Sequence, residues 1–182
     1  MILKSPFNDK EPKIDPTAFV APNAVIIGDI EIQEGANIWF SAVLRADWGS
    51  IKIGKNTSVQ DNCTIHAEPN SVAKIGENCI LGHNCMVHGP TEIGNNVLIG
   101  INATILTHTK INSNCVIAAG SVVTERTICK SLVLYGGIPA EELKIYENEK
   151  KIARQITMGS TMYVSNGKKF KAFFDQNQNN IQ

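Results

Sequence analysis

Residues 75–123 read IGENCILGHNCMVHGPTEIGNNVLIGINATILTHTKINSNCVIAAGSVV and carry Ile, Leu or Val at every sixth position. Nine such positions follow one another, from Ile75 to Val123. Outward from this stretch, the same spacing occupies residues 14–44 and 53–65. The interruptions are three extra residues near 48–50 and four within 68–74. All 18 positions are aliphatic, so a six-residue internal repeat organises the first two thirds of the chain.

In most repeats a small side chain recurs four residues after the aliphatic one, and Asn, Asp or Gly recurs three residues after it. These last types tolerate a positive φ and suit tight corners. The corner positions are Asn23, Asp29, Gly35, Asn56, Asn62, Asn78, Asn84, Asn96, Asn102, Asn114 and Gly120. The chain also has 24 Ile against 8 Leu, an excess that favours strands. The pattern predicts a mainly β protein, a parallel β-helix of about six triangular coils over residues 11–126.

The rest of the chain differs from the repeat. We expect residues 1–135 to form the β-helix with an N-terminal cap, and residues 136–175 to form a turn and a C-terminal α-helix packed on the coil. The helix is predicted from Glu141 to about Phe174, broken or frayed near Gly159 or Gly167. Residues 176–182, rich in Asn and Gln, are expected to be a flexible tail.

The composition excludes several function classes. Lys plus Arg and Asp plus Glu number 17 each, so the net charge is zero and argues against nucleic-acid binding. No run of 18 apolar residues predicts a membrane span, and the first 12 residues, MILKSPFNDKEP, do not resemble a signal peptide. We therefore expect a cytoplasmic protein without membrane or nucleic-acid partners.

The repeat places three of the four histidines. His66 and His88 follow aliphatic positions on the third face of adjacent coils, so they should stack about 4.8 Å apart, the strand spacing. Arg45 precedes them by one coil in the same column. His83 lies around a corner on the second face, with Asp61 one coil before it and Gln60 beside Asp61.

One chain therefore presents two histidines on one face and the third on another. If the third face of one subunit packs against the second face of its neighbour, all three converge, and cyclic closure gives a homotrimer. The same packing sets Arg45 near the neighbour's Asp61. Three imidazoles with a vacant fourth position suit catalytic Zn²⁺, which lowers the pKa of bound water to about 7 and supplies hydroxide. The alternative is surface histidines without a metal.

The other candidate groups are interpreted as structural. His108 has no partner in either column and is expected to be a corner residue. Cys129 follows the predicted coil and is expected to be exposed. The remaining cysteines fall on the small inward position and are predicted to be core residues: Cys63, Cys79, Cys85 and Cys115.

At these residues a family resemblance emerges. Arg45-x-Asp47, Gln60-Asp61, His66 and Gly82-His83-x-x-x-x-His88-Gly89 resemble the γ-class carbonic anhydrases, especially their short bacterial branch. The later Gly137-Ile138-Pro139-Ala140 turn and the C-terminal helix are also similar, so the resemblance covers roughly residues 10–165.

The resemblance implies a left-handed β-helix and a homotrimer with metal at each subunit interface, held by His66 and His88 of one chain and His83 of the next. It implies a lyase that reversibly hydrates carbon dioxide to bicarbonate with a zinc-bound hydroxide, Zn²⁺ being replaceable by Fe²⁺ or Co²⁺. Its further implied residues are Gln60 for orienting hydroxide or substrate, Tyr163 near the pocket, and an interface group of Arg45, Asp47 and Asp61.

The sequence departs from the family beside the site. Trp48 follows Asp47 where the best-studied branch has a glutamate, and Glu68 is the only acid in the short loop 67–74. Few acids near the site predict slow proton transfer, and thus low or absent activity. Two alternative functions are a hexapeptide-repeat acyltransferase that uses acyl-CoA with a histidine base, and a non-catalytic scaffold trimer stapled by metal.

Overall fold

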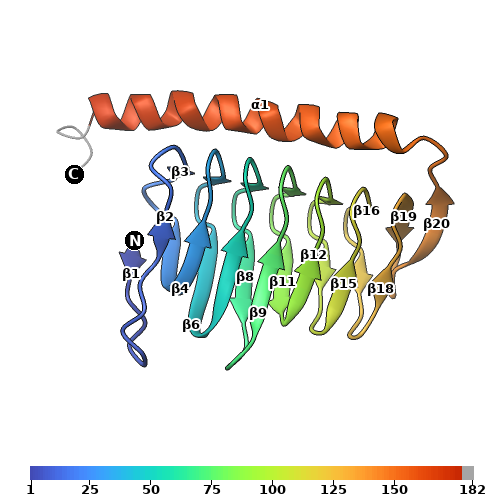
Figure 1. Cartoon of the computed structure of the whole chain (residues 1–182), viewed down its shortest axis with the longest axis horizontal. Helices are drawn as coiled ribbons and strands as arrows, with labels where there is room; N and C mark the ends of the chain where they lie inside the picture. The colour runs from blue at the N-terminus through green and yellow to red at the C-terminus, as the bar shows by residue number, and fades with distance from the viewer. Residues whose placement is uncertain (178–182) are drawn as a thin grey trace.

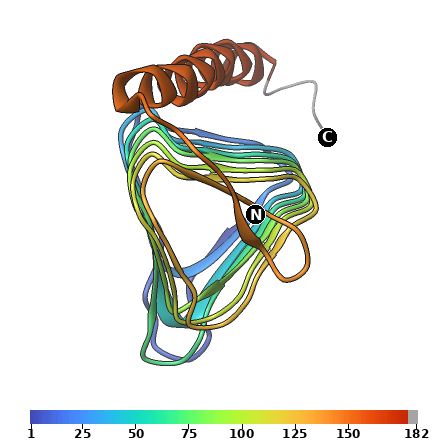
Figure 2. The same cartoon turned by 90° about the vertical axis from the view of Figure 1, so that its right-hand side faces the viewer.

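A computed structural model describes residues 1–177 of the chain, which fold as a triangular prism of parallel strands with one long helix along its side (Figures 1 and 2). The predicted tail falls mainly on residues 178–182, outside the described residues. The mainly β class and the single C-terminal helix predicted from the repeat are confirmed.

The second face of the prism is one sheet whose strands follow the coils in order. This sheet has seven parallel strands, one from each coil, so the prism has seven coils rather than the six that the aliphatic spacing predicts. They are β3 (Phe19–Val20), β5 (Asn37–Ile38), β7 (Ser58–Val59), β10 (Ile80–Leu81), β13 (Leu98–Ile99), β16 (Val116–Ile117) and β19 (Val133–Gly136).

The other two faces share a sheet because β4 (Val25–Ile32) and β6 (Val43–Ile53) bend around a corner. β6 pairs with β8 on the third face and with β9 on the first. The third face continues with β8 (Thr64–Ala67), β11 (Met86–Gly89), β14 (Thr104–Ile105) and β17 (Val122–Val123). The first face comprises β2 (Lys13–Ile14), β9 (Val72–Ile75), β12 (Thr91–Ile93), β15 (Thr109–Ile111) and β18 (Ile128–Cys129).

The predicted inward positions form the core. Ile26, Leu44, Ile65, Val87 and Ile105 are all fully buried, one above another on the third face. Most of the predicted corner positions have φ between +50° and +70°: Gly35, Asn56, Asn62, Asn78, Asn84, Asn96, Asn102, Asn114 and Gly120. Asn23 and Asp29 do not adopt this conformation. The six-residue spacing thus sets both the packing and the turns.

The seventh coil explains one wrong prediction. Cys129 is not exposed outside the coil but fully buried, paired in register with Ile111. It and Tyr135 continue the six-residue spacing beyond Val123 with residues that are not Ile, Leu or Val. The other four cysteines are buried as predicted. Burial raises the pKa of the Cys79 thiol to about 12, so this side chain stays protonated in the core.

The C-terminal segment also differs from its prediction. Residues 141–145 form β20 (Glu141–Ile145), which pairs antiparallel with β19 and passes across the end of the prism in Figure 2. The helix α1 (Glu149–Gln176) begins at the cap Asn148, whose side chain accepts a hydrogen bond from the Lys151 amide.

Helix α1 runs unbroken through Gly159 and Gly167, contrary to the predicted break, because both glycines face the coil. A Cβ at Gly159 would lie 2.7 Å from Ile80 Cδ1, and one at Gly167 would lie 3.1 Å from Phe19 Cβ. The glycines therefore permit close approach of the helix to the second face, where Ile152 and Ile156 pack against Ile80 and Val116.

The N-terminal residues extend the prism. β1 (Ile2–Leu3) pairs with β4 beside Ile26 and Ile27, and β2 pairs with the end of the same strand. Residues 4–12 between them form a loop that reaches toward the third face, as described below. No helix within residues 1–177 is long and apolar enough to cross a membrane.

Candidate metal centre

Two histidines stack on the outer wall of the third face. His66 on β8 pairs in register with His88 on β11, and Arg45 on β6 pairs with His66, as the repeat predicts. The two imidazole rings are nearly parallel, with centroids 5.5 Å apart and an interplanar angle of 18°. The parallel ladder therefore delivers two nitrogen donors to one side of the prism.

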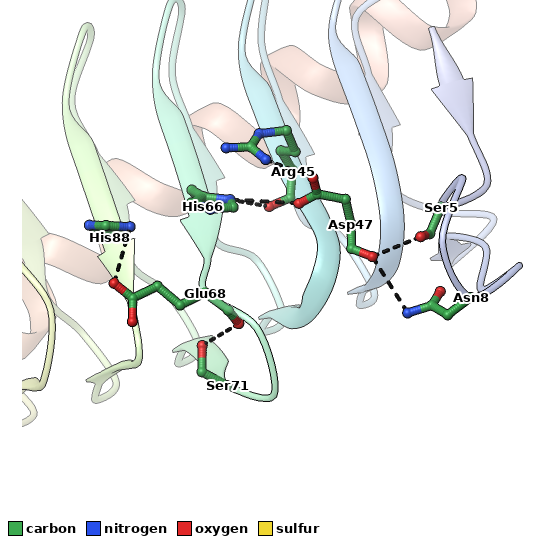
Figure 3. A network of polar contacts seen from close by, with 8 residues as sticks. All are labelled: Ser5, Asn8, Arg45, Asp47, His66, Glu68, Ser71 and His88. Carbon is green, nitrogen blue, oxygen red and sulfur yellow. Dashed lines mark hydrogen bonds and ion pairs between the residues drawn. The ribbon is translucent and has the colours of Figure 1, made fainter.

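The backbone fixes the tautomer of His66. Its Nδ1 lies 2.9 Å from the carbonyl oxygen of Arg45 (Figure 3). A carbonyl only accepts hydrogen bonds, so Nδ1 carries the ring proton and Nε2 keeps a lone pair. Nε2 is therefore the atom that can bind a metal, and the His66 side chain as a whole is 17% exposed.

His83 is held at the corner that follows β10. Its Nδ1 lies 2.9 Å from Asp61 Oδ2, so the carboxylate borders this side of the ring. The His83 backbone amide donates to Gln60 Oε1 at 3.2 Å, which holds the Gln60 side chain against this corner. The His83 side chain is 40% exposed, whereas Gln60 is almost completely buried.

The helix α1 lies along the second face of the prism. α1 contacts β3, β5, β7 and β10 and so covers the second face (Figure 2). The flat second face of this chain is therefore occupied by its own helix, and the packing of a third face on a neighbour's second face stays a prediction.

Tyr163 lies on α1 at this side of the molecule. Its ring packs edge-on against Trp39 at a centroid distance of 5.7 Å. Burial, with a smaller contribution from the Asp61 carboxylate, raises the pKa of the Tyr163 phenol. The phenol therefore stays a hydrogen-bond donor at neutral pH.

The charges beside His66 pair within the chain. Arg45 Nη1 contacts Asp47 Oδ2 of the same chain at 2.7 Å. The sequence predicts a different partner for Arg45, the Asp61 of a neighbouring subunit. The second carboxylate oxygen, Asp47 Oδ1, is buried, has no hydrogen-bond partner within residues 1–177, and lies 4.0 Å from His66 Nδ1. Asp47 thus borders both Arg45 and the first histidine.

Glu68 is a site residue that the sequence interpretation did not include in the site. Its Oε1 lies 3.7 Å from His88 Nε2, and its side chain is 41% exposed (Figure 3). It follows β8 by one residue, and the Glu68 carbonyl accepts from Ser71 Oγ at 2.8 Å. Its two-residue separation from His66 on a strand was the signal available, because alternate residues share a face.

His108 takes no part in this arrangement. It occupies a corner, with φ of 60°, as predicted, and its Nδ1 lies 3.1 Å from Thr107 Oγ1. Within the part of the chain that the structure describes, no group of three or more His, Cys, Asp or Glu side chains is arranged to hold a metal. A single chain brings together His66 and His88, and it presents His83 separately at the corner.

The donor set fits a metal of the zinc type. His66 Nδ1 has a backbone carbonyl as hydrogen-bond acceptor, and His83 Nδ1 lies beside a carboxylate; both are usual outer-shell neighbours of metal-binding imidazoles. Two rings lie stacked on one wall and the third projects from another. The chemistry of the donors therefore suits a shared site between subunits.

Comparisons with known proteins identify the class. The model of the bacterial transferase hexapeptide family, described as six repeats, matches residues 72–100 and 90–125. A hexapeptide transferase family protein from Anaplasma phagocytophilum is 30% identical, with a TM-score of 0.86 over 93% of this chain and 98% of that one. A Bacillus cereus protein, classed provisionally with the acetyltransferases, is 31% identical, with a TM-score of 0.88 over 95% and 98% of the two chains.

The chain therefore belongs to the hexapeptide-repeat family, and its resemblance to the γ-class carbonic anhydrases is confirmed. It is 34% identical over 167 residues to γ carbonic anhydrase 2, a mitochondrial protein of Arabidopsis thaliana, covering 88% of this chain and 56% of that protein. It is 36% identical over 83 residues to a carbonic anhydrase of Geobacillus kaustophilus, covering 46% of each. The chain thus spans about half the length of these curated relatives.

Proposed function

We propose that the chain is the subunit of a homotrimeric, metal-dependent enzyme that interconverts carbon dioxide and bicarbonate. The observation that carries this proposal is the stacked pair His66 and His88, with the His66 Nδ1 proton fixed by the Arg45 carbonyl. The third ligand is His83 of the neighbouring subunit, oriented by Asp61. The resemblance to γ carbonic anhydrases supports the same assignment.

Zn²⁺ is the proposed ion, and Fe²⁺ or Co²⁺ fits the same three imidazoles. When bound, the ion supplies Lewis acidity that makes hydroxide available near neutral pH. The chain's own residues then orient the reactants. Because Gln60 Oε1 accepts from the His83 amide, the Gln60 amino group is free to donate to an oxygen of hydroxide or substrate.

Two further residues have proposed roles around the same centre. Tyr163, which keeps its proton, is the proposed hydrogen-bond donor from the helix side. Glu68 can receive a proton beside His88 and release it to solvent, because its carboxylate is partly exposed. The proposed role of Arg45, Asp47 and Asp61 is to stabilise the interface between subunits through charge pairs. With a single acid of this kind, proton release is expected to limit turnover.

Stopped-flow CO₂ hydration tests the proposal, using protein loaded with Zn²⁺ or, anaerobically, with Fe²⁺. Activity should be lost in His88→Ala and retained in His108→Ala, which alters the corner histidine outside the column. Equal activity in the wild type and His88→Ala would remove the enzyme assignment. The same samples should contain about one metal per subunit, and His88→Ala much less.

A second candidate, acyl transfer from acyl-CoA, is favoured by the transferase names of the structural relatives. It uses a histidine as base and does not require three of them. CoA-dependent acylation that persists after metal removal, with no CO₂ hydration, would support it. Metal binding without either activity would instead indicate a scaffold trimer held together by metal.

A further inference from the structure

The N-terminal loop closes on the backbone of Asp47, beside the candidate metal centre. Ser5 Oγ donates to the Asp47 carbonyl at 2.7 Å, and Asn8 Nδ2 donates to the same oxygen at 3.5 Å (Figure 3). Ser5 is only 1% exposed, and its hydroxyl also accepts from the Phe7 amide at 3.0 Å. We call residues 5–8 the N-terminal arm.

The arm contacts a place where the strand ladder is interrupted. On β6, Ala46 pairs with Gly28 of β4, and the next pair joins Ser50 to Asp29. Residues 47–49 therefore bulge out of the register with β4. The arm provides partners for this bulge: its serine and asparagine bind the Asp47 carbonyl, and its Phe7 ring stacks on Trp48 at 4.2 Å.

The bulge in turn carries the carboxylate that borders the first histidine. Asp47 Oδ2 contacts Arg45 Nη1 at 2.7 Å, and Asp47 Oδ1 lies 4.0 Å from His66 Nδ1. The Arg45 carbonyl accepts the His66 Nδ1 proton. A shift of the bulge would move the carboxylate that holds Arg45, and Arg45 carries the carbonyl that orients His66.

We propose that Ser5 and Asn8 are positioning residues for the metal centre, acting through Asp47 and Arg45 on the orientation of His66. This inference rests on the proposed function, because it assigns the arm a role at the same site. Neither residue is a proposed ligand of the metal. Their effect is to keep His66 Nε2 directed toward the open side of the column.

The experiment measures Co²⁺ affinity by competition with a chromophoric chelator, together with the thermal unfolding of the metal-free protein. Ser5→Ala should weaken Co²⁺ binding about 5–10-fold, at the lower end of effects seen for outer-shell groups. Ser5→Thr keeps the hydroxyl and should stay within about twofold of the wild type. The matched control is Ser121→Ala, because Ser121 is equally buried and accepts a hydrogen bond from Gly137 far from the histidines.

Asn8→Ala is the second variant, since it removes only the longer bond and leaves the buried serine in place. It should weaken Co²⁺ binding by about twofold. Equal Co²⁺ affinity in Ser5→Ala, Asn8→Ala and Ser121→Ala would overturn the positioning role. If the wild type and His66→Ala bind Co²⁺ equally, the metal centre itself is wrong, so the two failures are distinguishable.

Discussion

Mixing two inactive variants tests whether the metal centre is shared between subunits. The structure places His66 and His88 on one wall and His83 at a corner, and the proposed site takes the pair from one chain and the single residue from the next. His83→Ala and His88→Ala should each be inactive alone. In a mixed trimer, one junction joins an intact pair to an intact His83, whichever variant is in excess.

The recovered activity follows from this geometry. Every mixed trimer has one complete site out of three, or about one third of wild-type activity per trimer. Random reassembly of an equimolar mixture gives about three quarters mixed trimers, and therefore about one quarter of wild-type activity overall. The measurement is stopped-flow CO₂ hydration on metal-loaded protein after the two variants are co-refolded.

A matched mixture gives the opposite expectation. His66→Ala and His88→Ala each damage the pair that one chain must supply, so their mixture should contain no complete site and recover no activity. Recovery in this mixture, or none with His83→Ala and His88→Ala, would refute the shared centre. Size-exclusion chromatography with light scattering checks that every mixture is trimeric.

Three other outcomes follow from single contacts. Ile99→Ala should lower the free energy of unfolding in urea by about 2–5 kcal/mol, because Ile99 is fully buried. The exposed Ile101→Ala should change it by under about 0.5 kcal/mol, and equal losses would contradict the inward assignment. Asp61→Ala should weaken zinc binding about 10–100-fold in a chelator competition, because it removes the carboxylate that lies 2.9 Å from His83 Nδ1; unchanged affinity would rule out this orienting role. Burial raises the pKa of Tyr135 from 10.0 to about 12, so the unfolded chain loses this proton first. The free energy of unfolding should therefore fall as the pH rises from 10 toward 12, by up to about 1.4 kcal/mol per pH unit. Tyr135→Phe should flatten this fall, and an unchanged slope would exclude Tyr135 as its source.

The six-residue spacing predicts the coil because each repeat is local. An aliphatic inward side chain and a corner residue with positive φ recur every six residues, and together they define one strand and one turn of the coil. The stacking of His66 on His88 follows from the register between adjacent coils. The aliphatic spacing predicts six coils, whereas the structure has seven. The seventh coil has Cys129 and Tyr135 at its inward positions. These residues are buried because they pair in register with Ile111 and Ile117 of the preceding coil, although they are not Ile, Leu or Val.

The C-terminal segment shows where local reasoning ends. Residues 141–145 contain charged residues of good helix propensity, yet they form β20, because the edge of β19 offers unpaired backbone groups. Gly159 and Gly167 predict helix breaks by propensity, whereas the structure uses them for close contact with Ile80 and Phe19. Tertiary contacts decide both features.

By itself, the sequence determines the repeat, the inward core, the corners and the column of Arg45, His66 and His88, because all of these depend on spacing along one strand ladder. Only the tertiary structure decides that α1 covers the second face, that Arg45 pairs with Asp47, and that Ser5 holds the Asp47 bulge. These contacts join segments separated by tens of residues with no common spacing. Their geometry depends on how the ladder is interrupted, and a six-residue count does not contain that information.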